Sequence, residues 1–151
     1  KKILDNFMYV NSIHLLDYVS IICRGQISKI QNYTKWKKNT KQIISSKIFF
    51  SSGDVVYYNA TWNIPAPWSI TVYQDENTFL LKPLENFSIS KNNSLKFKKL
   101  KNKDNDDKNF KPGLKKQNKE FIKAILKQKN NLPTLDNSLK VSKLINLIYR
   151  V

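Results

Sequence analysis

Apolar side chains recur every three or four positions near the start of the chain. This spacing predicts a helix within residues 6–24, whose first turn lies either at the start of this segment or near Asn11. Its two faces should carry different residues: one has Ile13, Leu16, Ser20 and Cys23, and the other has Val10, His14, Asp17 and Ile21. Gly25 is expected to stop this helix, with Arg24 at its negative end.

From Gln26 to about Leu100 the apolar period changes to two, which predicts strands. The candidates, rich in β-branched and aromatic residues, are Gln26–Trp36, Lys47–Ser51, Asp54–Asn63, Ser69–Gln74, Thr78–Lys82, Phe87–Ser90 and Leu95–Leu100. Turn residues stand at 52–54 and 75–77, and such short intervals favour an antiparallel meander. The segment 64–67 contains Pro65 and Pro67 and is expected to be a loop, because proline cannot donate to a ladder.

The rest of the chain predicts a polar surface loop and two helices. Residues 101–109 mix charges without apolar side chains, which is typical of a disordered loop. A helix should open near Pro112 and fade by Lys129, its apolar face made of Phe110, Leu114, Gln117, Phe121 and Ile125. Thr134 is a good N-cap for a second helix, whose buried side should hold Leu139, Val141, Leu144, Ile145 and Ile148.

This order of elements predicts an α+β fold with an open-faced, mostly antiparallel sheet and helices packed on one of its faces. Residues 1–151 suffice for a single domain with its own core. In one strand, Val55, Tyr57 and Asn59 alternate with Val56, Tyr58 and Ala60, so both sheet faces are apolar. We therefore expect a homodimer or homotetramer formed through the sheet face.

The net charge of +16 raises the possibility of a polyanionic partner. Only Arg24 and Arg150 are arginines, and the lysines are scattered, which favours a solvated lysine surface over a nucleic-acid-binding domain. No apolar run is long enough for a membrane span. The single cysteine, Cys23, excludes an internal disulfide and a cysteine-based zinc site, and it fits a reducing cytoplasm.

The single histidine carries the candidate chemistry. His14 and Asp17 are three residues apart on the predicted helix, so the acid can hold the imidazole in a useful tautomer. The alternative is a purely structural hydrogen bond between them. No set of metal ligands and no nucleophile motif is present, and Gly25, Gly53 and Gly113 lie too far apart to form a dinucleotide-binding loop.

Two tryptophans flank a proline-stiffened loop. Trp62, Asn63 and Trp68 could together form a stacking platform for a sugar or a base. The alternative is that both rings pack into the core of the sheet.

In this order, the pieces resemble the later part of the glucose–fructose oxidoreductase / inositol dehydrogenase (Gfo/Idh/MocA) family. The segment Asn11–Asp17 followed by Gly25 looks like the family's His-x-x-Asp helix. The region from Gly53 to Glu85 is similar to members that act on nucleotide-linked or surface-polysaccharide sugars. The segment from Phe110 to Phe121 and the helix after Thr134 look like the closing part of the family.

The resemblance implies a C-terminal substrate-binding and oligomerisation domain of an NAD(P)-dependent sugar oxidoreductase. The N-terminal Rossmann domain, which binds NAD or NADP in the full-length enzyme, is absent, as is the family's catalytic Glu-Lys-Pro motif, so the chain alone should bind no cofactor and be inactive. His14 carries over as the catalytic histidine, and the predicted substrate-binding residues are Asn11, Asp17, Trp62, Asn63 and Trp68.

The chain also departs from the family. Many members have an aspartate four residues before the histidine, whereas this chain has Val10 there. The segment that normally precedes this helix is missing, so we expect a fragment of a larger enzyme. The alternatives are a catalytically inert homo-oligomerising module and, less favoured, a basic nucleic-acid-binding domain.

Overall fold

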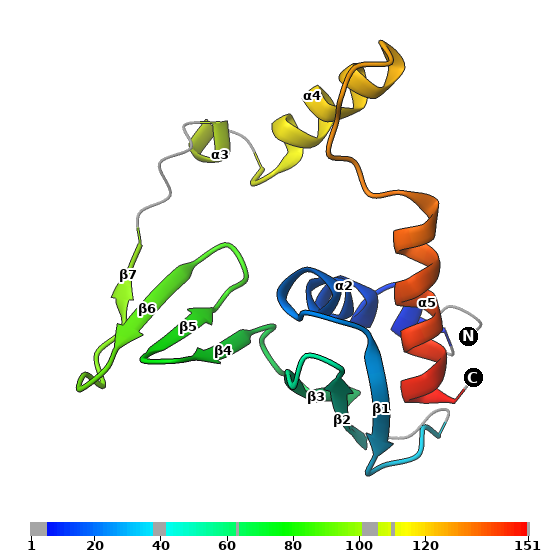
Figure 1. Cartoon of the computed structure of the whole chain (residues 1–151), viewed down its shortest axis with the longest axis vertical. Helices are drawn as coiled ribbons and strands as arrows, with labels where there is room; N and C mark the ends of the chain where they lie inside the picture. Colours follow the sequence, from blue (N-terminus) through cyan, green and yellow to red (C-terminus); the bar gives the residue numbers. More distant parts are fainter. Residues whose placement is uncertain (1–5, 38–41, 63, 101–105, 110, 151) are drawn as a thin grey trace. The chain divides into compact units, whose positions relative to one another are not determined.

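The computed structural model describes residues 6–37, 42–62, 64–100, 106–109 and 111–150. The chain forms two compact units, one of Lys1–Ala66 with Thr134–Val151 and one of Pro67–Pro133. Both contain helices and antiparallel strands, which confirms the predicted α+β class (Figure 1). The sequence analysis did not predict these two units. Its prediction that residues 1–151 form a single domain remains a prediction.

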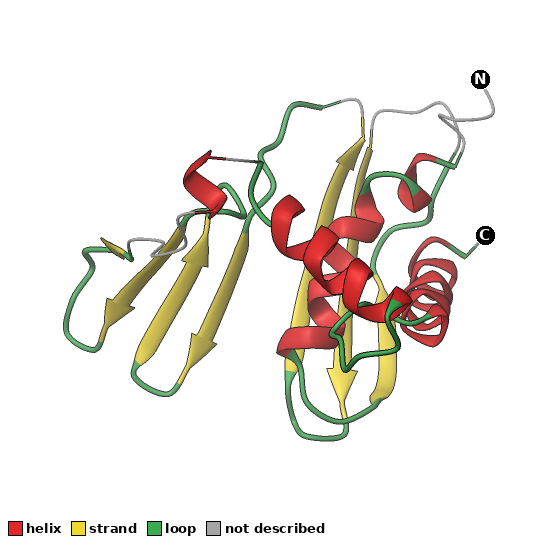
Figure 2. Ribbon diagram, turned by 90° about the horizontal axis from the view of Figure 1, so that it is seen from above, coloured by secondary structure: helices red, strands yellow, loops and turns green. Residues whose placement is uncertain are grey.

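The first unit is a three-stranded antiparallel sheet with helices on one face. Its strands lie in the order β1 (Ile27–Asn32), β2 (Gln42–Phe50) and β3 (Val55–Trp62). The short 3-10 helix η1 (Phe7–Tyr9) leads into α2 (Ser12–Ile22), and α5 (Leu135–Tyr149) packs against both. The core residues of β2 and β3 all lie on the sheet face that packs against these helices, as the sequence predicts (strands are yellow and helices red in Figure 2).

Strict alternation along the strands builds the core of this unit. The core holds inward-facing residues of both strands and helices: Met8, Leu16, Ile44, Ile48, Phe50, Tyr58, Trp62, Val141, Leu144, Ile145, Ile148 and Tyr149. On the opposite face of the sheet, Ile43, Val55 and Tyr57 are exposed. The same face also carries polar Ser45, Lys47, Asn59 and Thr61, so it is mixed in character, and the helices cover only the other face.

The N-terminal helix α2 starts next to the expected Asn11 but is shorter than residues 6–24, since Phe7–Tyr9 form a separate 3-10 helix and α2 ends at Ile22; its inner face is also slightly rotated. Ser12 and Leu16 are buried and Val19 and Cys23 pack against the core, whereas Ser20 is exposed and bonds the carbonyl of Asp17. The chain then turns sharply at Gly25, whose φ is +74°. A Cβ at that position would lie 2.5 Å from the Ser51 Oγ, so only glycine fits there.

The C-terminal helix begins as predicted. The Thr134 hydroxyl accepts a hydrogen bond from the Asn137 backbone, and the Asn137 side chain accepts one from Thr134, which completes a capping box. The expectation that Leu139 is buried is wrong, since its side chain is 51% exposed. At about 100° per residue, Leu139 points away from the face that carries Val141 and Ile148.

The second unit contains a separate four-stranded antiparallel sheet. Its strands follow one another as β4 (Ile70–Gln74), β5 (Asn77–Leu81), β6 (Phe87–Lys91) and β7 (Lys98–Lys99). The strands thus divide between two sheets instead of one. The break falls at the expected loop around Pro65 and Pro67, which cannot continue a ladder.

Two further expectations change in this unit. Residues 101–105 of the expected polar loop lie outside the described residues, and 106–109 form the short helix α3 (Asp106–Asn109). Asp106 and Asp107 stand in the first turn of α3, where acidic side chains are favourable, and Asp106 also pairs with Lys115 and Lys119 on α4 (Leu114–Ile125). Helix α4 has the expected bounds; Leu114, Phe121 and Ile125 on its apolar face are exposed, and Phe110 lies outside the described residues.

An exposed ion pair joins the end of α2 to the β2–β3 turn. The Arg24 side chain donates to both Asp54 oxygens, at 2.7 and 3.2 Å, and the Arg24 backbone N–H donates at 2.8 Å. These hydrogen bonds from Arg24 hold the pKa of the Asp54 carboxyl well below its ordinary value.

We predict that Arg24→Gln returns the pKa of Asp54 toward its ordinary value of about 4. The pKa of Asp54 is lower in the folded state than in the unfolded state, so the ion pair stabilises the protein fully at pH values above the unfolded-state pKa. This stabilisation is lost as the pH falls through the folded-state pKa. Carboxyl NMR titration of both proteins measures the shift. Asp106, whose pKa is lowered by Lys115 and Lys119, is the internal control and should not respond.

Candidate functional site

The predicted catalytic histidine lies on the solvent side of α2. His14 is exposed, Asp17 is half-buried one turn further along, and Asn11 is the residue that precedes the helix. The opposite side of α2 is anchored by fully buried Leu16. The helix therefore presents an imidazole on a rigid support, and residues Asn11, His14 and Asp17 share one short segment of the fold.

A buried chain of hydroxyl groups fixes α2 to the rest of the unit. The Tyr149 hydroxyl lies 2.9 Å from the Ser12 Oγ and 2.8 Å from the Tyr58 hydroxyl. Burial raises the pKa of Tyr58 far above its ordinary value, so this phenol stays protonated. One hydroxyl from α5 thus links α2 to β3.

We predict that Tyr149→Phe destabilises the protein by about 1–3 kcal/mol, because it leaves the hydroxyls of Ser12 and Tyr58 buried without this partner. Urea denaturation followed by circular dichroism measures the change. Tyr73→Phe removes a hydroxyl from a side chain that is 80% exposed and should have almost no effect. Equal stability of the two variants would contradict a structural role for the hydroxyl chain.

The two tryptophans of the predicted stacking platform have different environments. Trp62 is only 8% exposed, and its ring centroid lies 4.5 Å from that of Trp36, 5.6 Å from Phe7 and 6.1 Å from Tyr149. Trp62 therefore packs into the core, as in the alternative interpretation, and does not form an exposed stacking surface. Trp68 is 37% exposed and belongs to the second unit, and Asn63 lies outside the described residues.

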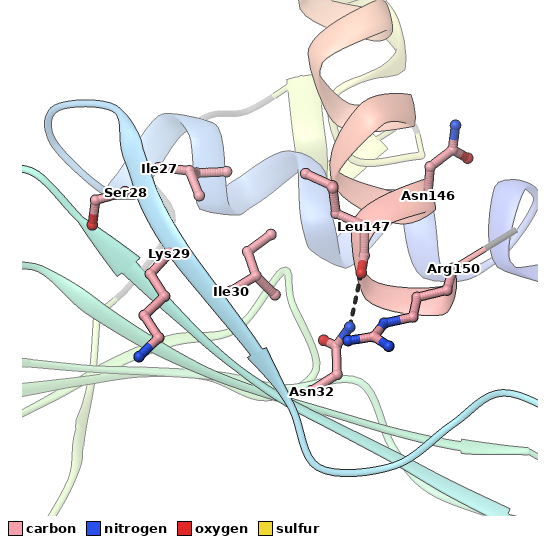
Figure 3. A pocket seen from close by; sticks show the side chains of 8 residues that line it. All are labelled: Ile27, Ser28, Lys29, Ile30, Asn32, Asn146, Leu147 and Arg150. Carbon is pink, nitrogen blue, oxygen red and sulfur yellow. Dashed lines mark hydrogen bonds between the residues drawn. The ribbon is translucent and has the colours of Figure 1, made fainter.

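A groove lies between β1 and the end of α5, where the sequence indicated nothing. It has a volume of about 410 Å³ and is lined by Ile27, Ser28, Lys29, Ile30, Asn32, Asn146, Leu147 and Arg150 (Figure 3). None of the predicted site residues lines it. Its walls come from opposite ends of the sequence, so no local motif could have marked it.

The uncovered face of the first sheet carries a cluster of lysine and aromatic side chains. The Lys47 ammonium lies 4.8 Å from the Phe49 ring centroid and 5.0 Å from that of Tyr57. A hydrogen bond with Tyr57 raises the pKa of Lys47. The lysines of this face thus partly cover aromatic rings, and Tyr57 itself is 68% exposed.

Other kinds of chemistry have little support in the part of the chain that the structure describes. No group of three or more potential metal ligands occurs among those residues. Burial, followed by the nearby Asp54 charge, raises the pKa of the Cys23 thiol, which disfavours the nucleophilic thiolate. Within the same residues, no helix combines the length and apolar character that crossing a bilayer requires.

Comparison of the chain with protein-family models, with curated proteins and with solved structures finds no match. The resemblance to the Gfo/Idh/MocA family therefore stays a prediction.

Proposed function

We propose that the chain is the substrate-binding and assembly portion of a cytoplasmic NAD(P)-dependent oxidoreductase that acts on a hydroxyl of a sugar or nucleotide-linked sugar. The observation that carries the proposal is the position of His14: the only imidazole of the chain is exposed on a helix that is rigidly anchored from behind. A catalytic group needs both access and a fixed support.

In this proposal, His14 takes up the proton of the sugar hydroxyl at an imidazole nitrogen, and Asp17 and Asn11 orient the ring and the sugar. NAD or NADP serves as the hydride acceptor in such an enzyme. Its binding is assigned to a separate nucleotide-binding domain, because Gly25, Gly53 and Gly113 are too dispersed to form a phosphate-binding loop.

The test is a dehydrogenase assay on the protein expressed from its whole reading frame. Formation of NADH or NADPH is followed by absorbance with a panel of nucleotide-linked sugars, and each sugar is also tested for a rise in melting temperature. Turnover with at least one sugar supports the proposal. Absence of both turnover and thermal stabilisation across the panel would overturn it.

The alternative of a homo-oligomerising module is favoured by a different observation. The sheet face opposite the helices exposes the side chains of Ile43, Val55 and Tyr57, with Ile43 separated from the other two by the polar pair Ser45 and Asn59. Large exposed apolar side chains on an uncovered sheet face can contribute to a protein–protein interface. Self-association is compatible with the enzyme proposal, and the two are separated by the assay above.

We expect Tyr57→Glu to weaken self-association at least about tenfold, because it places a charge in the centre of the proposed interface. Sedimentation velocity over a concentration series measures the dissociation constant. Tyr73→Glu, which introduces the same charge on β4, is the matched control. A wild-type protein that stays monomeric at about 100 µM would exclude this interface.

A further inference from the structure

The groove between β1 and α5 runs along an unpaired strand edge. β1 is the terminal strand of its sheet and pairs only with β2 in the part of the chain described. Its other edge presents backbone N–H and C=O groups toward the groove, the arrangement that can accept a further strand.

The residues that line the groove show that the backbone of β1 is accessible there. A β-bulge between Ile27 and Lys29 interrupts the alternation of side chains along β1, so that Ile27 and Ile30 face α5 while Ser28 and Lys29 face away from it. One pocket is nevertheless lined by all four residues, which they share along the edge of the strand. Ser28 donates to the Phe49 carbonyl, and the Lys29 ammonium lies over the Phe49 ring, so both side chains point toward β2. Figure 3 shows them directed away from α5.

The other wall of the groove is formed by α5 and carries one apolar side chain, Leu147, between the polar Asn146 and the positively charged Arg150. Leu147 faces Ile27 and Ile30 across the gap, and Leu147 and Ile27 are exposed (Figure 3). The Asn32 amide donates to the Leu147 carbonyl at 2.8 Å, which closes this end. The Arg150 guanidinium lies beside Asn32, and none of the eight described residues that line the groove is acidic.

We propose that this groove binds the C-terminal segment of a partner protein by strand addition to β1. The peptide runs parallel to β1, places an apolar side chain between Ile30 and Leu147, and ends at Arg150, which binds its terminal carboxylate. The closed end at Asn32 stops the peptide, and a guanidinium is the side chain best suited to a carboxylate. Arg150 is essential because the C-terminal end of a helix by itself repels anions.

The experiment measures fluorescence polarisation of labelled hexapeptides of alternating valine and threonine that end in valine, leucine, phenylalanine or tyrosine. Each peptide is made with a free carboxylate, with a C-terminal amide, and with N-methylated backbone. We expect saturable binding of the free acid, about tenfold weaker binding of the amide, and loss of binding on N-methylation. Hydrogen exchange should show new protection of the β1 amides.

Arg150→Gln should weaken binding of the free acid about tenfold and leave binding of the amide unchanged. The substitution and the amidation of the peptide each remove the contact between the guanidinium and the terminal carboxylate, so their effects should not add. Lys143→Gln, which removes a positive charge from α5 outside the groove, is the matched control, and circular dichroism verifies folding of both. The proposal is overturned if no free acid binds at about 1 mM, if N-methylated peptides bind equally well, or if inorganic phosphate alone displaces the peptide.

Discussion

Replacing His14 with alanine should lower kcat of the proposed sugar dehydrogenase by roughly 10²–10⁴-fold, the usual contribution of a general acid–base residue. The melting temperature should stay unchanged, because the His14 side chain is exposed while the opposite side of α2 holds the core contacts. Steady-state kinetics with the sugar identified in the panel measure the loss.

A control variant and a rescue experiment separate chemistry from structure. Ile21→Gln alters an exposed position two turns further along the same helix and should change kcat by less than about twofold. Added imidazole should restore part of the activity of His14→Ala, which an indirect structural effect would not permit. Full activity of His14→Ala would remove His14 from the proposed mechanism.

Replacing Trp62 with alanine should destabilise the first unit by about 3–5 kcal/mol, the range measured for large aromatic residues in cores. Trp62 contacts Phe7, Trp36 and Tyr149, so its removal opens a cavity among side chains from η1, α5 and the chain after β1. Guanidinium denaturation followed by circular dichroism measures the change in unfolding free energy.

Trp68→Ala is the matched control, because it removes the same side chain from a more exposed position. We expect a loss of no more than about 1 kcal/mol. If instead the two tryptophans formed a sugar-stacking platform, both variants would lose sugar binding and neither would lose much stability. Equal and small stability losses would therefore contradict the core role of Trp62.

Part of the candidate site could be predicted from the sequence. His14 and Asp17 lie where the helical period places them, since a spacing of three residues fixes their relation within α2. The residues that Trp62 contacts could not be predicted, because an aromatic residue at the end of a strand can either pack into the core or line a pocket. The groove at β1 was equally hidden, because Ile27 and Leu147 meet only after the chain has folded.

The sequence by itself determined the local elements, because their signals act between near neighbours. Thr134 caps α5, Gly25 turns the chain after α2, and alternation along β3 places Tyr58 and Trp62 on the same face of the sheet. Only the tertiary structure decided which strands share a sheet and that Arg24 meets Asp54. These outcomes depend on which distant segments of the chain bury and pair with one another, and this cannot be predicted from the residues of any one short segment.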